Sequence, residues 1–246
     1  MLTEMWDRNS RIVIVAAHPD DETIGMGGQL ASLENVMLIQ ATDGAPRRRA
    51  DWRQYARARR GELLCAASLA AIAPERCIEI GLPDQEAAYH LVELSCHLSR
   101  LFREIRPEII FTHPYEGGHP DHDATAFAVH QAASAPIVEF TSYHRGASGG
   151  IETGCFLGPA GEVFRLSGRQ KSMKQRMLDC FSTQCETLRW FHVDQERFRR
   201  APEYDFCRPP HPGPVFYESF DWGCNFIEWQ RQARRAEERI GTCLSR

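Results

Sequence analysis

The stretch RIVIVAAHPDDETIGMGGQL, residues 11–30, places a run of aliphatic side chains directly before a histidine, three acids and three glycines. A continuous apolar run such as 11–16 is typical of a strand that is covered on both faces, as in a parallel sheet. Residues 22 to about 33 follow as a short predicted helix. A strand that ends in so many potential ligands indicates that this edge of the sheet is functional.

Short aliphatic runs alternate with longer helical patterns over the first 145 residues. Further strands are predicted at 36–41, 77–82, 108–113 and 136–143, and helices at 51–72, 86–105 and 123–133. Alternation of strands and helices predicts an α/β fold, a Rossmann-like and mostly parallel sheet with helices on both faces.

The second part of the chain, 146–246, has weaker patterns. It predicts short strands at 149–158 and 162–168, a helix over 168–191, a proline-rich loop at 201–216 and a last helix at about 225–240. No stretch has the composition of a linker. We therefore expect a single domain over residues 1–246, with a catalytic core at about 11–145 and C-terminal strands and helices packed on it.

Composition narrows the class of protein. With 43% hydrophobic and 25% charged residues the chain resembles an ordinary globular protein, and a net charge of −4 argues against a nucleic-acid partner. The first residues lack the basic-then-apolar order of a signal peptide, and no apolar run is long enough to span a membrane. Nine scattered cysteines without a CxxC pair predict reduced thiols in a cytoplasmic protein.

A second stretch, HPYEGGHPDHDATAFAVH at 113–130, begins where the predicted strand 108–113 ends. In open parallel sheets, ligands bind beyond the carboxyl ends of strands, where the strand order reverses. If the first and fourth strands are neighbours across such a reversal, the segments 18–21 and 119–122 face each other.

Imidazole and carboxylate side chains together suit a divalent first-row metal, and zinc above all. A catalytic zinc uses three protein ligands and keeps one position open. His18 and Asp21 are three residues apart and share one side of a starting helical turn, so Asp20 points away and is free to act as a base. The two stretches contain more histidines and acids than one metal needs, so several ligand sets remain open.

Each of these residues also has a structural explanation. The acids at 20–22 could cap a helix, a histidine at a strand end could be a hydrogen-bonded turn residue, and the glycines could only permit tight turns. For any one residue that explanation is the better one. Two HPD segments at equivalent positions after two strands favour the metal site instead.

The segments AAHPDDETIGMGG and GGHPDHDA resemble the two signature motifs of the PIG-L/LmbE-like family of zinc-dependent N-acetylglucosaminyl deacetylases. The similarity covers about residues 11–145. It implies removal of an acetyl group from an N-acetylglucosamine unit, with Zn²⁺ or another first-row metal as cofactor. The implied metal ligands are His18, Asp21 and His122.

The same resemblance implies the catalytic roles. Asp20 corresponds to the family's general base, and His119 to the residue that supports the oxyanion and the leaving group, with Asp121 tuning it. Some relatives carry a mobile tyrosine two residues before HPDH. That position is Gly117 here, and Tyr115 is a weak substitute for it.

The family's RxxE and LPD landmarks match Arg59 with Glu62, and Leu82-Pro83-Asp84. They imply that Arg59 and Asp84 hold the sugar. What carries the sugar is left open, as is self-association into a homo-oligomer. One alternative is an amidase that cleaves a larger acyl or thiol conjugate from an amino sugar. A non-catalytic nucleotide-binding Rossmann module is disfavoured, because GMGG lies after the HPDD turn and not between strand and helix.

Two further segments carry chemistry. Seven arginines at 47–60, with two aromatic rings among them, are a polyanion patch, a solvated face or, as we prefer, a mobile edge of the site that meets a phosphate or carboxylate of the substrate. The aromatic and proline-rich segment 208–222 fits a sugar-stacking lid and a strap over the core equally well.

Overall fold

The aliphatic run after Arg11 forms an inner strand of the sheet, and every side chain of that strand is buried. The computed structural model describes residues 2–244. Seven strands form the main sheet in the order β3-β2-β1-β4-β5-β9-β8, and only the pairs β5/β9 and β9/β8 are antiparallel. The strands are β1 (Ile12–Ala16), β2 (Val36–Pro46), β3 (Cys77–Asp84), β4 (Ile109–Thr112), β5 (Ile137–Phe140), β8 (Glu162–Arg165) and β9 (Gln195–Arg200). The predicted α/β class is confirmed.

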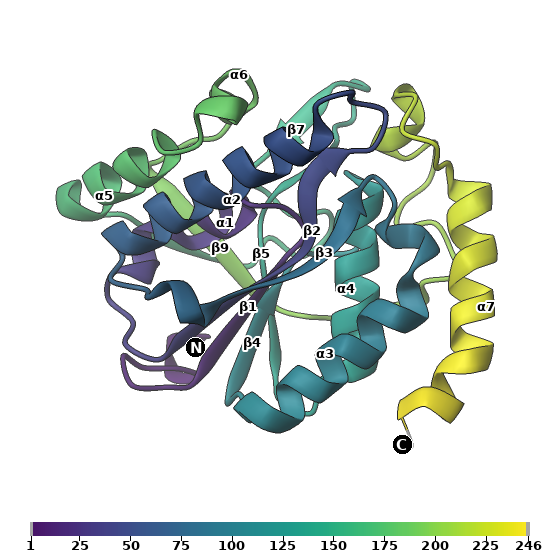
Figure 1. Cartoon of the computed structure of the whole chain (residues 1–246), viewed down its shortest axis with the longest axis horizontal. Helices are drawn as coiled ribbons and strands as arrows, with labels where there is room; N and C mark the ends of the chain where they lie inside the picture. Colours follow the sequence, from purple (N-terminus) through teal and green to yellow (C-terminus); the bar gives the residue numbers. More distant parts are fainter. Residues whose placement is uncertain (1, 245–246) are drawn as a thin grey trace.

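Helices cover both faces of this sheet (Figure 1). One face packs against α1 (Asp21–Leu30), α2 (Trp52–Leu69) and α5 (Gly168–Leu178), and the other against α3 (Leu91–Ile105), α4 (Pro120–Ala132) and α7 (Phe226–Leu244). Alternate residues of β1 supply the two cores, since Ile12 and Ile14 face the first group and Val13 and Val15 the second. A strand covered on both faces reads as a continuous apolar run.

Shorter elements complete the chain. A separate hairpin is formed by β6 (Tyr143–Arg145) and β7 (Ile151–Thr153), which are antiparallel. The remaining turns of helix are η1 (Leu2–Glu4), η2 (Pro74–Arg76), η3 (Ala87–Tyr89), η4 (Ser182–Gln184), α6 (Cys185–Leu188) and η5 (Phe216–Ser219).

The strand order reverses between β1 and β4. β1 pairs with β2 on one side and with β4 on the other, in both cases in parallel, and Ile14 lies opposite Phe111. This confirms that the first and fourth predicted strands are neighbours. The loops that leave their carboxyl ends therefore open onto one edge of the sheet, where ligands bind in folds of this kind.

Two predicted elements differ from the structure, and one strand was not predicted. The helix expected over 168–191 ends at Leu178, because the Glu62 carboxylate accepts hydrogen bonds from Ser182 Oγ and from Thr183 N and Oγ1 and so fixes a new turn there. The strand expected at 136–143 is divided into β5 and β6. β9 was not predicted, because its sequence QERFRR is mostly polar.

The structure tests two predictions made from composition, that the cysteines are reduced and that no segment spans a membrane. Among the residues that the structure describes, seven cysteines are free thiols, but Cys96 is disulfide-bonded, so the prediction of reduced thiols throughout is wrong. Spacing along the chain could not show this, because disulfides join residues that are distant in sequence. Within residues 2–244, no helix combines the length and the apolar character needed to cross a membrane.

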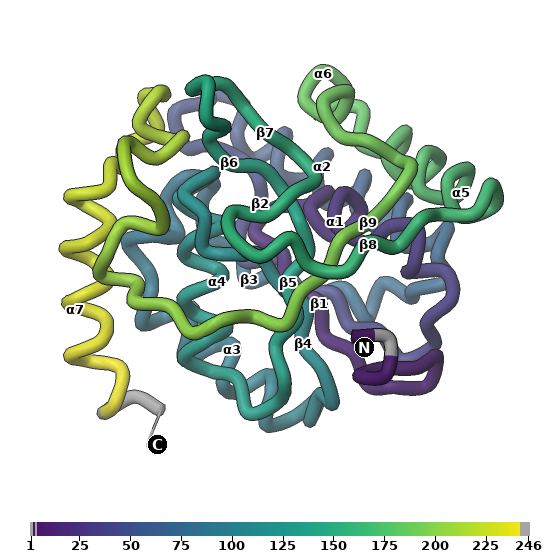
Figure 2. The backbone as a smooth tube through the Cα atoms, turned by 180° about the vertical axis from the view of Figure 1, so that it is seen from behind, coloured from purple at the N-terminus to yellow at the C-terminus, as the bar shows by residue number. Residues whose placement is uncertain are grey.

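The C-terminal extension shares a core with the first part of the chain. The segment between β9 and α7 crosses the back of the molecule (Figure 2), where the ring of Phe206 lies 5.2 Å from that of Phe127 in α4. Trp229 of α7 is fully buried, and its Nε1 donates a hydrogen bond to Phe206 O. On this basis we propose that the core and the extension unfold as one unit.

Replacing Trp229 with alanine tests this proposal. Loss of a large buried ring leaves a cavity, so the free energy of unfolding should fall by about 3–5 kcal/mol, measured by urea denaturation. The matched control is Trp190→Ala, whose side chain is 54% exposed and whose loss should change stability by less than about 0.5 kcal/mol. Two separate unfolding transitions in the unmodified chain would contradict the single unit.

Candidate functional site

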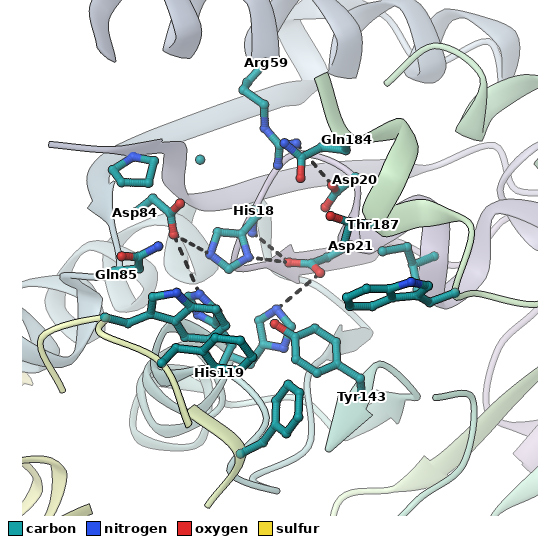
Figure 3. A pocket seen from close by; sticks show the side chains of 18 of the residues that line it. His18, Asp20, Asp21, Arg59, Asp84, Gln85, His119, Tyr143, Gln184 and Thr187 are labelled. Carbon is teal, nitrogen blue, oxygen red and sulfur yellow. Dashed lines mark hydrogen bonds and ion pairs between the residues drawn. The ribbon is translucent and has the colours of Figure 1, made fainter. Parts of the chain in front are cut away.

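The two HPD segments meet at the carboxyl edge of the sheet. The chain leaves β1 through Ala17 and His18 and enters α1 at Asp21, while the segment after β4 enters α4 at Pro120. Figure 3 shows His18 between Asp84 on one side and Asp21 on the other, within a single cavity. The topology therefore brings together side chains that are about 100 residues apart in the sequence.

His18, Asp21 and His122 form a compact donor set. His18 Nδ1 lies 3.2 Å from Asp21 Oδ2, and His122 Nε2 lies 3.3 Å from Asp21 Oδ1. All three ligand atoms lie within 4.8 Å of one another. Tetrahedral zinc with nitrogen and oxygen ligands at usual bond lengths needs donor separations of about 3.3–3.4 Å. The three side chains thus fit a zinc ion of this geometry.

The other ring nitrogen of His18 faces two carboxylates. Nε2 lies 3.1 Å from Asp121 Oδ2 and 3.2 Å from Asp84 Oδ1. A carboxylate behind a metal-binding histidine fixes the tautomer and orientation of the ring. Although burial alone would lower it, the pKa of His18 is raised well above its usual value by hydrogen bonds to Asp121, Asp21 and Asp84.

A second possible donor set consists of His18, Asp84, His119 and Asp121. The Asp121 carboxylate, however, already accepts hydrogen bonds from the backbone N–H groups of Gln85 and Ala87, at 2.6 and 3.0 Å. Asp121 Oδ2 lies 3.9 Å from His119 Nδ1 but only 3.1 Å from His18 Nε2. These contacts favour Asp121 as a partner of His18 and the first donor set as the metal ligands.

Asp20 is kept out of the donor set by its backbone. It has φ of 130°, which non-glycine residues rarely adopt, and its N–H donates to Glu22 Oε2. Its Oδ2 lies 3.2 Å from Arg59 Nη1 (Figure 3). Burial and the neighbouring Asp21 charge raise the pKa of Asp20 to about 7, although Arg59 and His18 oppose this. A carboxyl group with a pKa near neutrality is suited to accept a proton.

His119 offers one nitrogen to the cavity. Its Nδ1 accepts the backbone N–H of Asp121 at 3.1 Å, so the proton of the neutral ring resides on Nε2. Nε2 lies 3.8 Å from Asp84 Oδ1, and the ring packs on Trp222 with centroids 4.6 Å apart. Burial, and then the charge of His18, lowers the pKa of His119 well below its usual value. A neutral ring in this position is a hydrogen-bond donor toward the cavity.

The cavity in front of these residues has a volume of about 370 Å³. Arg59 is buried on its wall, and Asp84 also lines the cavity. Of the arginine-rich segment, Arg48 and Arg49 also reach the wall. Arg48 donates to Gln85 Oε1, and Arg49 pairs with Asp51 and lies over the ring of Tyr55. The segment is therefore an edge of the cavity, but its side chains are held by neighbouring residues.

The segment 208–222 is both strap and cavity wall. Val215 and Tyr217 are buried in the core, whereas Phe216, Phe220 and Trp222 line the cavity. The rings of Phe220 and Trp222 are stacked at 4.3 Å. The burial of Val215 and Tyr217 agrees with a strap over the core, and the sugar-stacking lid stays a prediction for the residues that line the cavity.

Sequence reasoning missed two further residues of the site. His113 Nε2 accepts the N–H of Ala17, lies 3.4 Å from Asp21 Oδ2, and its ring stacks on His122 at 4.0 Å. Tyr143 lines the cavity at the start of β6. Both follow a strand at the ligand-binding edge of the sheet, which is the signal that could have found them.

Tyr115 does not substitute for the mobile tyrosine of some relatives. Its hydroxyl donates hydrogen bonds to Phe206 O and Arg208 O, and the residue is buried away from the cavity. Gly117 has a positive φ of 68°, and a Cβ there would lie 2.6 Å from Val215. No larger side chain fits at that position without movement of the strap.

Comparison with known proteins agrees with the geometry. Residues 13–133 match the family model described as PIG-L, GlcNAc-PI de-N-acetylase. That stretch contains both HPD segments, Arg59 and Asp84. The chain carries a PIG-L family domain.

The PIG-L domain also resembles individual enzymes. The chain is 29% identical over 186 aligned residues to a 1D-myo-inositol 2-acetamido-2-deoxy-alpha-D-glucopyranoside deacetylase of Kineococcus radiotolerans, and the alignment covers 60% of this chain and 50% of the relative. The chain thus spans about half the length of that relative.

Solved structures share the fold. A deacetylase of the teicoplanin biosynthesis pathway is 18% identical, with a TM-score of 0.58, and covers 79% of this chain and 100% of its own. A 4-carboxy-2-hydroxymuconate hydratase from Pseudomonas putida is 13% identical, with a TM-score of 0.57, and covers 78% and 98%. Enzymes named for different reactions have this fold, so the reaction must be argued from the site.

Proposed function

We propose that this PIG-L domain is a metal-dependent hydrolase that removes the N-acetyl group from an N-acetylglucosamine-containing substrate. The observation that carries the proposal is the separation of two adjacent acids. Asp21 belongs to a donor set with His18 and His122, while Asp20 is turned toward Arg59 at the cavity wall. The name of the Kineococcus relative supports an acetylated amino sugar as substrate.

His18, Asp21 and His122 would hold the metal. Zn²⁺ suits this mixture of imidazole and carboxylate, and iron or manganese can use the same ligands. A divalent metal there supplies Lewis acidity, which lowers the pKa of a water molecule and polarises a carbonyl group. Asp121, behind His18, keeps that ring oriented toward the donor set.

The remaining residues of the site transfer protons, donate hydrogen bonds or border the substrate. Asp20 accepts the proton of the attacking water, and the Arg59 guanidinium keeps the carboxylate in place. His119 donates a hydrogen bond from Nε2 to the oxygen that gains charge. The proton that Asp20 accepted from water passes to the amide nitrogen, so that the C–N bond breaks and the amine leaves. Asp84, 3.8 Å from that Nε2, and Arg59 border the space for the sugar.

An amidase for larger acyl groups is the second candidate, because the cavity continues along the aromatic side chains of Phe216, Phe220 and Trp222. Nucleotide binding is disfavoured by charge. In a dinucleotide-binding module the phosphate sits at the first helix N-terminus. That position of α1 is filled here by Asp20, Asp21 and Glu22.

A panel of N-acylated amino sugars tests the proposal. Purified protein with added Zn²⁺ should release a primary amine and acetate from an N-acetylglucosamine derivative, and chelation should stop the release. If the enzyme is specific for the acetyl group, N-hexanoyl derivatives should react more slowly than N-acetyl derivatives. A preference for the long acyl group would favour the amidase, and no amine release from any member of the panel would contradict both.

Arg59→Ala tests the substrate side of the site. Loss of a buried cation at the wall should lower kcat/KM by at least about tenfold, as expected for a lost charged hydrogen bond, while the metal content stays unchanged. The matched control is Arg57→Ala on the same helix, because Arg57 is exposed. Unchanged kinetics in Arg59→Ala would show that neither the substrate nor Asp20 depends on this side chain.

The proposal extends to surroundings and partners. The partner is a small amino-sugar substrate. We place the protein in the cytoplasm because seven of the described cysteines are free thiols, whereas a disulfide such as that of Cys96 is rare there. The net charge of −4 gives no reason to expect nucleic acid.

A further inference from the structure

The hairpin β6–β7 forms one wall of the active-site cavity and carries a second group of ligand-type side chains. Tyr143 and Ile151 line the cavity. His144 and Glu152 lie directly opposite each other on the two strands, so they are cross-strand neighbours. Gly154, with φ of 70°, turns the chain after β7, and Cys155 joins the pair.

The distances within this group match those between ligands of one metal ion. Cys155 Sγ lies 3.6 Å from His144 Nε2 and 3.3 Å from Glu152 Oε1, and all three atoms lie within 4.8 Å of one another. Tetrahedral zinc with one sulfur, one nitrogen and one oxygen ligand requires separations of about 3.4–3.6 Å. Only small side-chain rotations are needed to reach them.

His144 is already in the tautomer that a metal requires. The residue is 2% exposed, and its Nδ1 donates to the backbone carbonyl of Arg145 at 3.1 Å. The lone pair of the neutral ring is therefore on Nε2, which faces Cys155. A histidine that donates its other N–H to a carbonyl is the usual arrangement at metal sites, because it fixes the ring orientation.

A separate cavity of about 240 Å³ adjoins Glu152 and Cys155 and leaves room for a further ligand. Glu152, Cys155, His192 and Arg197 are among its lining residues, so water or the exposed His192 can complete the coordination. A thiolate and a carboxylate together neutralise a divalent cation. Arg197 therefore faces a site with no net charge when the metal is bound.

We propose that His144, Glu152 and Cys155 bind a second divalent metal ion of the zinc class, separate from the His18–Asp21–His122 donor set. Binding releases the thiol proton of Cys155 to solvent, and the thiolate becomes the ligand. The metal fastens the two strands of the hairpin to each other and to the following turn. Thr153 Oγ1 in the same hairpin donates a hydrogen bond to Trp190 O. By fixing the hairpin, the metal therefore also holds Tyr143, Ile151 and Trp190 at the cavity wall.

Cobalt binding tests this site without any measurement of activity. Metal-free protein kept reduced and titrated with Co²⁺ alone should bind two equivalents. One of them should show the near-ultraviolet charge-transfer absorption of a thiolate ligand, because only the hairpin site contains a cysteine. Cys155→Ser should lose that absorption and one equivalent. Glu152→Gln keeps the thiol and should weaken the same equivalent by about 10-fold or more.

Two controls separate this proposal from the proposed function. Cys180→Ser should keep both equivalents and the absorption, although Cys180 lies near another cysteine, Cys65. His18→Ala should lose the other equivalent and keep the absorption. Binding of Co²⁺ by the unmodified chain without thiolate absorption, or thiolate absorption that persists in Cys155→Ser, would overturn the hairpin site whether or not the protein is a deacetylase.

Discussion

Asp20→Asn is expected to lower kcat by about 10²- to 10⁴-fold, the usual effect of removing a positioned general base, while the metal stays bound. Asparagine keeps the size of the side chain but cannot accept the proton of water. Its amide cannot form the ion pair with Arg59, which lies 3.2 Å from the carboxylate in the structure. The measurements are kcat at saturating zinc and metal content by elemental analysis.

The neighbouring residue provides the matched control. Asp21 lies between His18 and His122, so Asp21→Asn should lower the affinity of the site for the metal, and added zinc should restore part of the activity. The two side chains are chemically identical and adjacent, and only their directions differ. If added zinc restores the activity of Asp20→Asn and not that of Asp21→Asn, the two roles are reversed.

His122→Ala should remove one bound metal per chain and leave no measurable hydrolysis at stoichiometric zinc. Three protein ligands provide no redundancy, so loss of one should be as severe as loss of either other ligand. His18→Ala and Asp21→Ala are expected to behave alike. Zinc should be counted in each purified, folded variant.

The control for the ligand variants is His90→Ala, because His90 contacts Glu93 near the surface and is not in the donor set. It should keep the full metal content and activity. A ligand variant that retains the same zinc as the unmodified protein would remove its residue from the donor set. Zinc bound at the hairpin does not affect this comparison. The hairpin site should stay filled in the His18, Asp21 and His122 variants, and its equivalent should be lost in the Cys155 variant.

The central sheet could be predicted because burial on both faces leaves a continuous apolar run, as in β1 and β4. β9 could not, because it pairs at the antiparallel side of the sheet with polar side chains that find partners far away in sequence. Arg199, for example, pairs with Glu116 and Glu139. The break in the helix expected over 168–191 likewise depends on Glu62, a residue of α2.

The proximity of the three proposed ligand side chains could be predicted from the motif and the strand order. The sequence places His18, Asp21 and His122 at one edge, and the structure brings them within ligand distance. The direction of the Asp121 carboxylate could not be predicted, because it is fixed by two backbone N–H groups of the loop after β3. Tyr143 is placed by a short hairpin whose pairing no local pattern shows.

The backbone of Asp20 has a consequence for engineering. A non-glycine residue with φ of 130° costs the folded state about 1–3 kcal/mol, and glycine would relieve that cost. Asp20→Gly would also leave the buried Arg59 guanidinium without its carboxylate, and loss of one partner of a buried ion pair costs about 3–5 kcal/mol. That cost exceeds the relief of strain, so Asp20→Gly should melt at a lower temperature than the natural chain and be inactive. Position 20 should be held constant in any library screened for heat resistance.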